Sequence, residues 1–159
     1  MGSIIESPSE LNGYLDFHAQ RLLESLRHWT GRELIDLSGS RLEQALRLFY
    51  APFIVVSHDT AAEPILNYAN QAALQLFEMT WQELTTTPSR LTAEPMHQEE
   101  RQRLLTRVSR QGFIDDYRGV RISKSGRRFM IEKATVWNLL SESGAHYGQA
   151  AMFSHWAYL

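Results

Sequence analysis

The chain has 159 residues, of which 43% are hydrophobic and 21% charged, a composition typical of one globular domain with a core of its own. The net charge is −2, and basic residues alternate with acidic ones, so no basic field for nucleic acid is expected. Cysteine is absent, which excludes disulfides, thiolate-ligated zinc, iron–sulfur clusters and cysteine nucleophiles.

The N-terminal sequence MGSIIESPSE lacks the positive start and long apolar run of a signal peptide. No stretch approaches the roughly 18 apolar residues that would indicate a membrane span. We therefore expect a cytoplasmic protein without a membrane segment.

The first third of the chain predicts two helices. Ser7 and Glu10 have the spacing of a capping box around Pro8, and Gly31 is placed to end the helix. A second capping box, Ser40 and Glu43, predicts the start of the second helix. The expected buried faces are Leu11, Leu15, His18, Leu22 and Leu26 on the first helix, and Leu42, Ala45, Leu46 and Phe49 on the second.

A hairpin and three helices are predicted next. The β-branched residues 53–56 and the segment 65–69 flank a turn, which indicates an antiparallel pair. Asn70 is placed to cap one short helix, and Thr80 with Glu83 forms a capping box before another. Pro88 and Pro95 interrupt regular structure, and residues 97–110 predict a longer helix.

The last third predicts three strands, at residues 113–122, 128–139 and 147–158, with Gly-containing turns between them. Short connections indicate an antiparallel meander, so the fold class is α+β. The second strand is half apolar on each face if it alternates regularly. We therefore expect one face of the sheet to be covered by its own helices and the other by the N-terminal helix or a second subunit.

Three segments resemble a known family: "NYANQAAL", "FMIEKATVWNL" and "GQAAMF". The hairpin followed by an Asn-capped helix resembles PAS domains, and residues 49–159 resemble the MEKHLA domain, a PAS-related family found in bacteria and in plant homeodomain–leucine zipper proteins. The resemblance implies a PAS-like five-stranded antiparallel sheet with short central helices. It leaves residues 1–48 as an N-terminal helical extension that packs on the sheet or on a partner. It implies a sensory or regulatory binding domain without catalytic residues.

The same resemblance raises the question of a cofactor. Pro88-Ser89-Arg90 lies where flavin-binding light-oxygen-voltage (LOV) domains keep Asn-Cys-Arg. Ser89 in place of the cysteine excludes a cysteinyl–flavin adduct, and only Arg90 is retained to meet a flavin phosphate. His97 comes too early in its helix for the haem ligand of PAS domains. Flavin is therefore disfavoured, haem more so, no metal site assembles, and the cofactor stays unknown.

Candidate ligand-binding residues come from charges and aromatic rings in unusual places. Glu132 and Lys133 lie in the middle of an apolar strand, where charges need partners. They form either a structural ion pair with Asp115, Asp116, Arg118 or Arg121, or a polar contact to a ligand in a cavity. The large aromatic residues suit a pocket wall as well as a core. The candidate set is Phe77, Trp81, Arg90, Glu132, Thr135, Trp137, Gln149 and Met152.

Three functions remain open. The first is a sensory module that holds a small molecule, contacts a regulatory protein, or both. The second is a pure interaction domain that forms a homodimer through the N-terminal helix. The third is a small enzyme of cone-like fold, with His58, Asp59 or Glu132 as acid or base. We favour the first, with no catalytic residues.

Overall fold

The computed structural model describes residues 6–159, and the order of its elements is the predicted one. Residues 1–5 of the predicted extension lie outside the described residues. The helical elements are η1 (Glu10–Leu15), α1 (Asp16–Thr30), α2 (Arg41–Phe49), α3 (Gln71–Phe77), α4 (Trp81–Leu84), η2 (Ser89–Thr92) and α5 (Pro95–Gln111). The strands are β1 (Ile54–His58), β2 (Leu66–Ala69), β3 (Phe113–Ile122), β4 (Arg128–Leu140), β5 (His146–Phe153) and β6 (His155–Tyr158).

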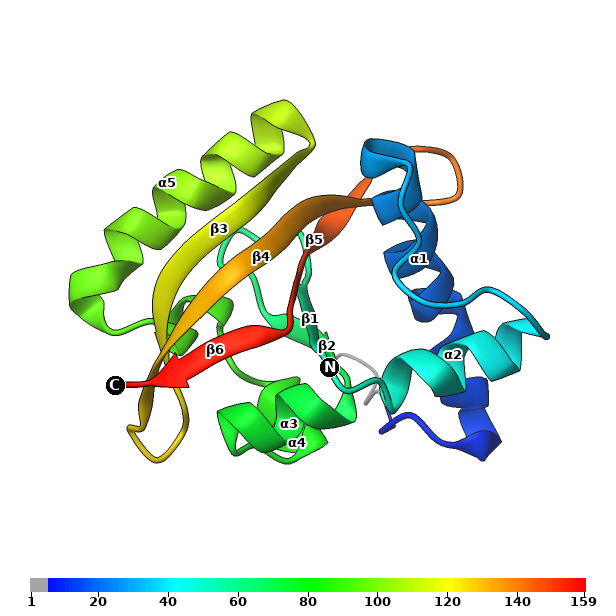
Figure 1. Ribbon diagram of the computed structural model, residues 1–159, viewed down its shortest axis with the longest axis horizontal. Coiled ribbons are helices and arrows are strands. Elements are labelled where there is room, and N and C mark those ends of the chain that lie inside the picture. Colours follow the sequence, from blue (N-terminus) through cyan, green and yellow to red (C-terminus); the bar gives the residue numbers. More distant parts are fainter. Residues whose placement is uncertain (1–5) are drawn as a thin grey trace.

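The strands form one antiparallel sheet in the order β2-β1-β5-β4-β3, with β6 paired to β4. Its two faces are covered by different parts of the chain, as predicted (Figure 1). We call the face covered by α3 and α5 the inner face; its core includes Phe129, Ile131, Ala134, Val136 and Phe153. We call the face covered by α1 the outer face; its core includes Leu22, Tyr68, Trp137, Leu139 and Ala150.

A kink in β4 changes which residues point to which face. Lys133 has a positive φ of 54°, which L-residues rarely adopt. The pairs Glu132–His155 and Thr135–Met152 place Lys133 opposite Ser154, where β5 ends and β6 begins. The predicted single strand over residues 147–158 is therefore divided. Regular alternation of β4 was also a wrong expectation, because Phe129 and Ile131 share the inner face with Ala134 and Val136 rather than with Trp137.

The start of the N-terminal region differs from the prediction. Ser9, not Ser7, caps η1, and its backbone N–H donates to Asn12 Oδ1 at 2.9 Å. Tyr14 and Leu15 have positive φ angles of 52° and 54°, so η1 and α1 are separate helices. Leu11 consequently leaves the predicted apolar stripe and is fully exposed. The predicted end of α1 is confirmed, since Gly31 has a φ of 72° and donates to Arg27 O at 2.8 Å.

Helix α2 begins at its predicted capping box, where Glu43 N donates to Ser40 Oγ at 3.2 Å. Its buried face is confirmed in part: Ala45 and Phe49 pack against the outer core as predicted, together with Leu48. Leu42 and Leu46, predicted to be buried, are 43% and 39% exposed. Apolar residues lie on more than one side of this short helix, so periodicity alone does not choose between them.

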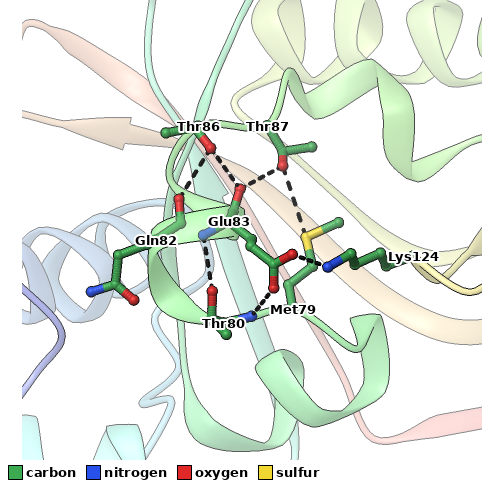
Figure 2. A network of polar contacts seen from close by, with 7 residues as sticks. All are labelled: Met79, Thr80, Gln82, Glu83, Thr86, Thr87 and Lys124. Carbon is green, nitrogen blue, oxygen red and sulfur yellow. Dashed lines mark hydrogen bonds and ion pairs between the residues drawn. The ribbon is translucent and has the colours of Figure 1, made fainter.

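The chain between β2 and α5 is held by the predicted caps. Asn70 Oδ1 accepts from Ala73 N at 3.2 Å, and Asn70 Nδ2 donates to Phe53 O at 2.8 Å, which ties α3 to the chain entering β1. Thr80 and Glu83 form the predicted capping box of α4 (Figure 2). The Glu83 carboxylate also pairs with Lys124 in the β3–β4 turn. These bonds hold α4 beside the turn and fix the segment that leads to η2.

Helix α5 begins at Pro95, two residues earlier than predicted, because proline is tolerated at the first helical position. On its exposed side, Glu99 and Arg103 form an ion pair at 3.1 Å. No helix among residues 6–159 is long and apolar enough to cross a membrane.

Candidate functional site

A cavity of about 70 Å³ lies between the inner face of the sheet and α5. One part of its wall is apolar: Leu66, Phe77, Leu104, Ile131, Val136 and Phe153. The other part is polar: His58, Ser89, Arg101, Tyr117, Arg121 and Gln149. Apolar walls with a few placed polar groups are typical of small-molecule sites.

Two arginines dominate the polar wall. Arg101 on α5 and Arg121 on β3 are only 8% and 7% exposed. Arg101 donates to the Ser89 hydroxyl, and Arg121 Nη2 donates to the Tyr117 hydroxyl at 3.0 Å. Burial, with a smaller effect of Arg121, lowers the pKa of Arg101 to about 10, so the Arg101 guanidinium remains charged at neutral pH.

His58 and Gln149 face each other across β1 and β5 on the same wall. Nδ1 of His58 lies 3.0 Å from Asp59 O, whereas its buried Nε2 has no hydrogen-bond partner among the described residues. Burial lowers the pKa of His58 to about 4, with a smaller effect of Arg101, so the imidazole is neutral at pH 7. Gln149 Nε2 donates to Leu105 O and to Asn138 Oδ1, both at 3.1 Å, and so ties the sheet to α5.

Only two of the eight predicted candidates line this cavity, namely Phe77 and Gln149. The remaining six lie elsewhere, so Thr135 and Trp137 do not line the cavity with Gln149. Arg90 and Glu132 are exposed and form ion pairs with Glu63 and Arg118, the latter at 3.2 Å. Trp81, Trp137 and Met152 pack on the outer core, and Thr135 Oγ1 donates to Asp115 Oδ1 at 2.6 Å.

The cavity residues that the sequence did not indicate are chiefly Arg101, Arg121 and Tyr117. A signal for the first was present, because Arg101 lies three and seven residues before Leu104 and Val108, on the buried stripe of α5. Arg121 follows Tyr117 by four residues on one strand, so the two lie on one face. A charge on a predicted buried stripe is rare enough to name as a site candidate.

The residues of the enzyme hypothesis do not converge. His58 lines the cavity, but Glu132 is exposed at the kink of β4 and is engaged by Arg118. Asp59 is held in the β1–β2 turn, where its carboxylate accepts from Ile65 N at 3.0 Å. Among the described residues, no three His, Asp or Glu side chains gather as a metal site would require.

The cavity does not fit a flavin. Ligand pockets for molecules of that size enclose roughly 300–1,000 Å³, against about 70 Å³ here. Ser89 lines the cavity, but Arg90, the expected phosphate ligand, does not. His97, considered as a haem ligand, lies in the first turn of α5 and is not part of the cavity wall.

A second, shallower depression lies on the surface between α1 and the β4–β5 turn, with a volume of about 340 Å³. Its wall includes Arg21, Glu24, His28 and Glu142. Arg21 and Glu24 already form an ion pair there, at 2.5 Å. Arg21 Nε has no hydrogen-bond partner among the described residues, so this depression has one unsatisfied buried atom in its wall, as the cavity has at His58 Nε2.

Solved structures with the same fold are PAS and LOV domains. A PAS domain from Colwellia psychrerythraea aligns with a TM-score of 0.61 at 16% identity, covering 74% of this chain and 94% of that one. A fungal LOV domain photoreceptor aligns with a TM-score of 0.57 at 18% identity, covering 87% and 91%. An RNA-binding LOV receptor also aligns, with a TM-score of 0.57 at 15% identity, over 77% of this chain and 36% of that one. These likenesses confirm the predicted PAS-like α+β fold.

The similar curated proteins are plant homeobox-leucine zipper proteins by name. Homeobox-leucine zipper protein HOX32 of Oryza sativa subsp. indica is 26% identical over 139 residues, which are 85% of this chain and 16% of the relative. Homeobox-leucine zipper protein ATHB-14 of Arabidopsis thaliana is 27% identical over 125 residues, 77% of this chain and 14% of the relative. This chain thus spans about a sixth of these proteins.

The model of the MEKHLA domain matches residues 16–158, including α1 and α2. The chain belongs to the MEKHLA domain family.

Proposed function

We propose that the protein is a sensory or regulatory module that binds a small ligand in the cavity of the inner face. The observation that carries this proposal is the cavity wall, which combines apolar side chains with buried polar ones, among them His58, whose Nε2 has no hydrogen-bond partner among the described residues. Buried polar groups without partners are costly in a protein interior, so a site that keeps them favours a function over a purely structural role. The PAS-like fold supports the same reading by analogy.

We further propose that residues 49–159 form the binding unit and that residues 1–48 receive its signal. Asn138 connects the two faces of the sheet. Its side-chain amide donates to Val108 O on α5 at 2.9 Å, while its backbone carbonyl accepts from Trp29 Nε1 on α1 at 2.9 Å. Two residues further along the same strand, Leu140 N donates to Ser25 Oγ on α1 at 2.8 Å. A ligand that shifts α5 against β4 would therefore also change the hydrogen bonds that hold α1 on β4.

The test uses a variant that fills the cavity. Ala151 lines it, and Ala151→Leu places three extra carbon atoms in a space of about 70 Å³. Ala157→Leu on exposed β6 is the matched control. The purified chain is examined by native mass spectrometry and by thermal shift across a metabolite library. We expect a ligand with the wild type and with Ala157→Leu but not with Ala151→Leu. The proposal fails if no library member raises the melting temperature of the wild type.

A second candidate function is a homodimer formed through the N-terminal helices. Leu42 and Leu46 on α2 and Tyr50, the residue that caps its C-terminus, follow one another at four-residue spacing, and all are exposed. Such a spacing places them on one side of the helix. Two copies of this stripe would present the same apolar side chains to each other, so a second copy of this chain is the partner we propose.

Light scattering tests this second function. We expect a dimer for the wild type and a monomer for Leu42→Glu/Leu46→Glu, with unchanged circular dichroism. A wild type that stays monomeric at high micromolar concentration would exclude it.

For either function we propose a cytoplasmic location and a small-molecule or protein partner. A net charge of −2 makes a nucleic acid a poor partner.

A further inference from the structure

The two buried arginines of the cavity lack a carboxylate partner. Within residues 6–159, ion pairs form at many exposed arginines but at neither Arg101 nor Arg121. The nearest carboxylate acts through an intermediate group: Glu100 Oε2 accepts from the Tyr117 hydroxyl at 2.9 Å, and that hydroxyl accepts from Arg121. The remaining partners, Ser89 and the backbone carbonyl of Val120, are neutral.

The charges around the cavity therefore do not balance. Arg101 and Arg121 contribute two positive charges, and Glu100 contributes one negative charge at the edge of the cluster. His58 is neutral at pH 7, and the Asp59 carboxylate lies outside the cavity wall, in the β1–β2 turn, where it accepts from the backbone N–H groups of Ala61 and Ile65. Burial of an unpaired charge in a protein interior is expensive, and buried charges are normally paired. One positive charge is left for an anion that the chain itself does not provide.

The chain pairs a buried arginine elsewhere. Arg21 on α1 is 5% exposed, and its guanidinium pairs with Glu24 at 2.5 Å and donates to Leu140 O at 3.3 Å. The missing partner is thus particular to the cavity. A guanidinium presents parallel N–H donors that match the two oxygens of a carboxylate.

The rest of the cavity limits what carries the negative charge. Apart from its polar part, the wall includes Phe77, Ile131, Val136 and Phe153, whose side chains form no hydrogen bonds. A volume of about 70 Å³ accommodates roughly five to seven water-sized groups. An anion with one charged end and a short apolar remainder satisfies both parts of the wall.

We propose that the cavity binds a short-chain monocarboxylate of about four to six non-hydrogen atoms. Its carboxylate lies between Arg101 and Arg121, and its alkyl part lies against Phe77, Ile131 and Val136. This inference rests on the proposed function, because it names the ligand class of the same cavity.

Titration calorimetry of the full chain tests the ligand class without any substitution. The probes are acetate, propionate and butyrate, with propionamide as the uncharged analogue of propionate, and inorganic phosphate and chloride as anions without an apolar part. We expect saturable binding of propionate or butyrate. Propionamide should bind weaker by on the order of tenfold or more, because it cannot form charge-assisted bonds to the arginines.

Variants then locate the site. Arg101→Gln and Arg121→Gln should each weaken propionate binding by on the order of tenfold or more. Arg103→Gln, on the exposed side of α5, is the matched control and should bind like the wild type. Arg101→Lys keeps the charge but loses the planar fork, and should bind with intermediate affinity. Circular dichroism checks that each variant folds. If a variant does not fold, the comparison of propionate with propionamide still tests the inference, because it uses the wild-type chain.

The possible outcomes separate this inference from the proposed function. Equal affinity for propionate and propionamide would overturn the anion while leaving a ligand-binding cavity. If phosphate or chloride binds and the carboxylates do not, the proposal that the ligand has an apolar part is wrong. If no probe binds, the inference falls, and the mass spectrometry of Ala151→Leu against Ala157→Leu decides separately whether the cavity holds another ligand.

Discussion

The two faces of the sheet are built from the same strands but differ in how closely they are packed. The outer face is filled by large rings: Tyr68 and Trp137 are completely buried, and Tyr68 contacts both Trp81 and His18. The inner face keeps a cavity and places two buried guanidiniums beside it. The difference indicates that the outer face holds α1 in place, whereas the inner face, where we propose that a ligand binds, is less closely packed and less completely charge-paired.

The largest expected effect concerns the packing of the outer face. Trp137→Ala should lower the free energy of unfolding by about 3–5 kcal/mol, because it removes a completely buried indole from the core. Chemical denaturation measures it. Leu11→Ala, at a fully exposed position, should change stability by less than about 0.5 kcal/mol. A loss near 1 kcal/mol for Trp137→Ala would mean that the outer face is as loosely packed as the inner one.

Most of this architecture could be predicted from the sequence, because its signals are local. Ser40, Asn70 and Thr80 cap the helices they were expected to cap, and Gly31 ends α1. The meander and its two covered faces followed from strands that are apolar on both sides. These signals depend only on residues that are close in sequence, so tertiary contacts do not alter the structure that they predict.

The site was largely beyond prediction, because it depends on a backbone irregularity. A positive φ at Lys133 exchanges the faces of β4 beyond that residue, which separates Trp137 and Thr135 from Gln149. Nothing in the residue type at that position indicates this, since a lysine has no preference for the left-handed region. Arg101 was recognisable in principle from its place on the buried stripe of α5, but its lack of a carboxylate partner is a tertiary property.

The second prediction compares a histidine of each face during acidification. Burial lowers the pKa of His18 on the outer face and of His58 on the inner face to about 4 each. The unfolded chain, with a histidine pKa near 6.5, binds more protons between those values, so stability falls as the pH falls. Each histidine should cost about 2 kcal/mol between pH 7 and pH 5.

Denaturation at several pH values checks this loss in His18→Asn and His58→Asn. Each variant should lose about 2 kcal/mol less than the wild type over the same interval. His146→Asn serves as the control, since that side chain is exposed. If the His58 variant keeps the full pH dependence while the His18 variant does not, solvent reaches the inner face more freely than the burial of His58 indicates.

The third prediction compares the two buried arginines. Arg21→Met should cost about 1–2 kcal/mol, since it leaves Glu24 and the Leu140 carbonyl without their donor. Arg101→Met should be neutral or stabilising by about 1 kcal/mol in the ligand-free chain, because no carboxylate loses a partner. Thermal unfolding of both variants measures the contrast. Equal destabilisation would show that Arg101 is a structural residue like Arg21.

The smallest expected effect lies at the kink between the faces. Glu132 was a candidate ligand contact, but its side chain is 49% exposed and pairs with Arg118, which is 66% exposed. Solvent screens such a pair, so the coupling in a double-mutant cycle of Glu132→Gln and Arg118→Gln should be below about 0.5 kcal/mol. Ligand affinity should not change in either variant, because neither residue lines the cavity. A coupling above about 1 kcal/mol, or a change in affinity, would mean that the kink transmits the state of the inner face to the surface.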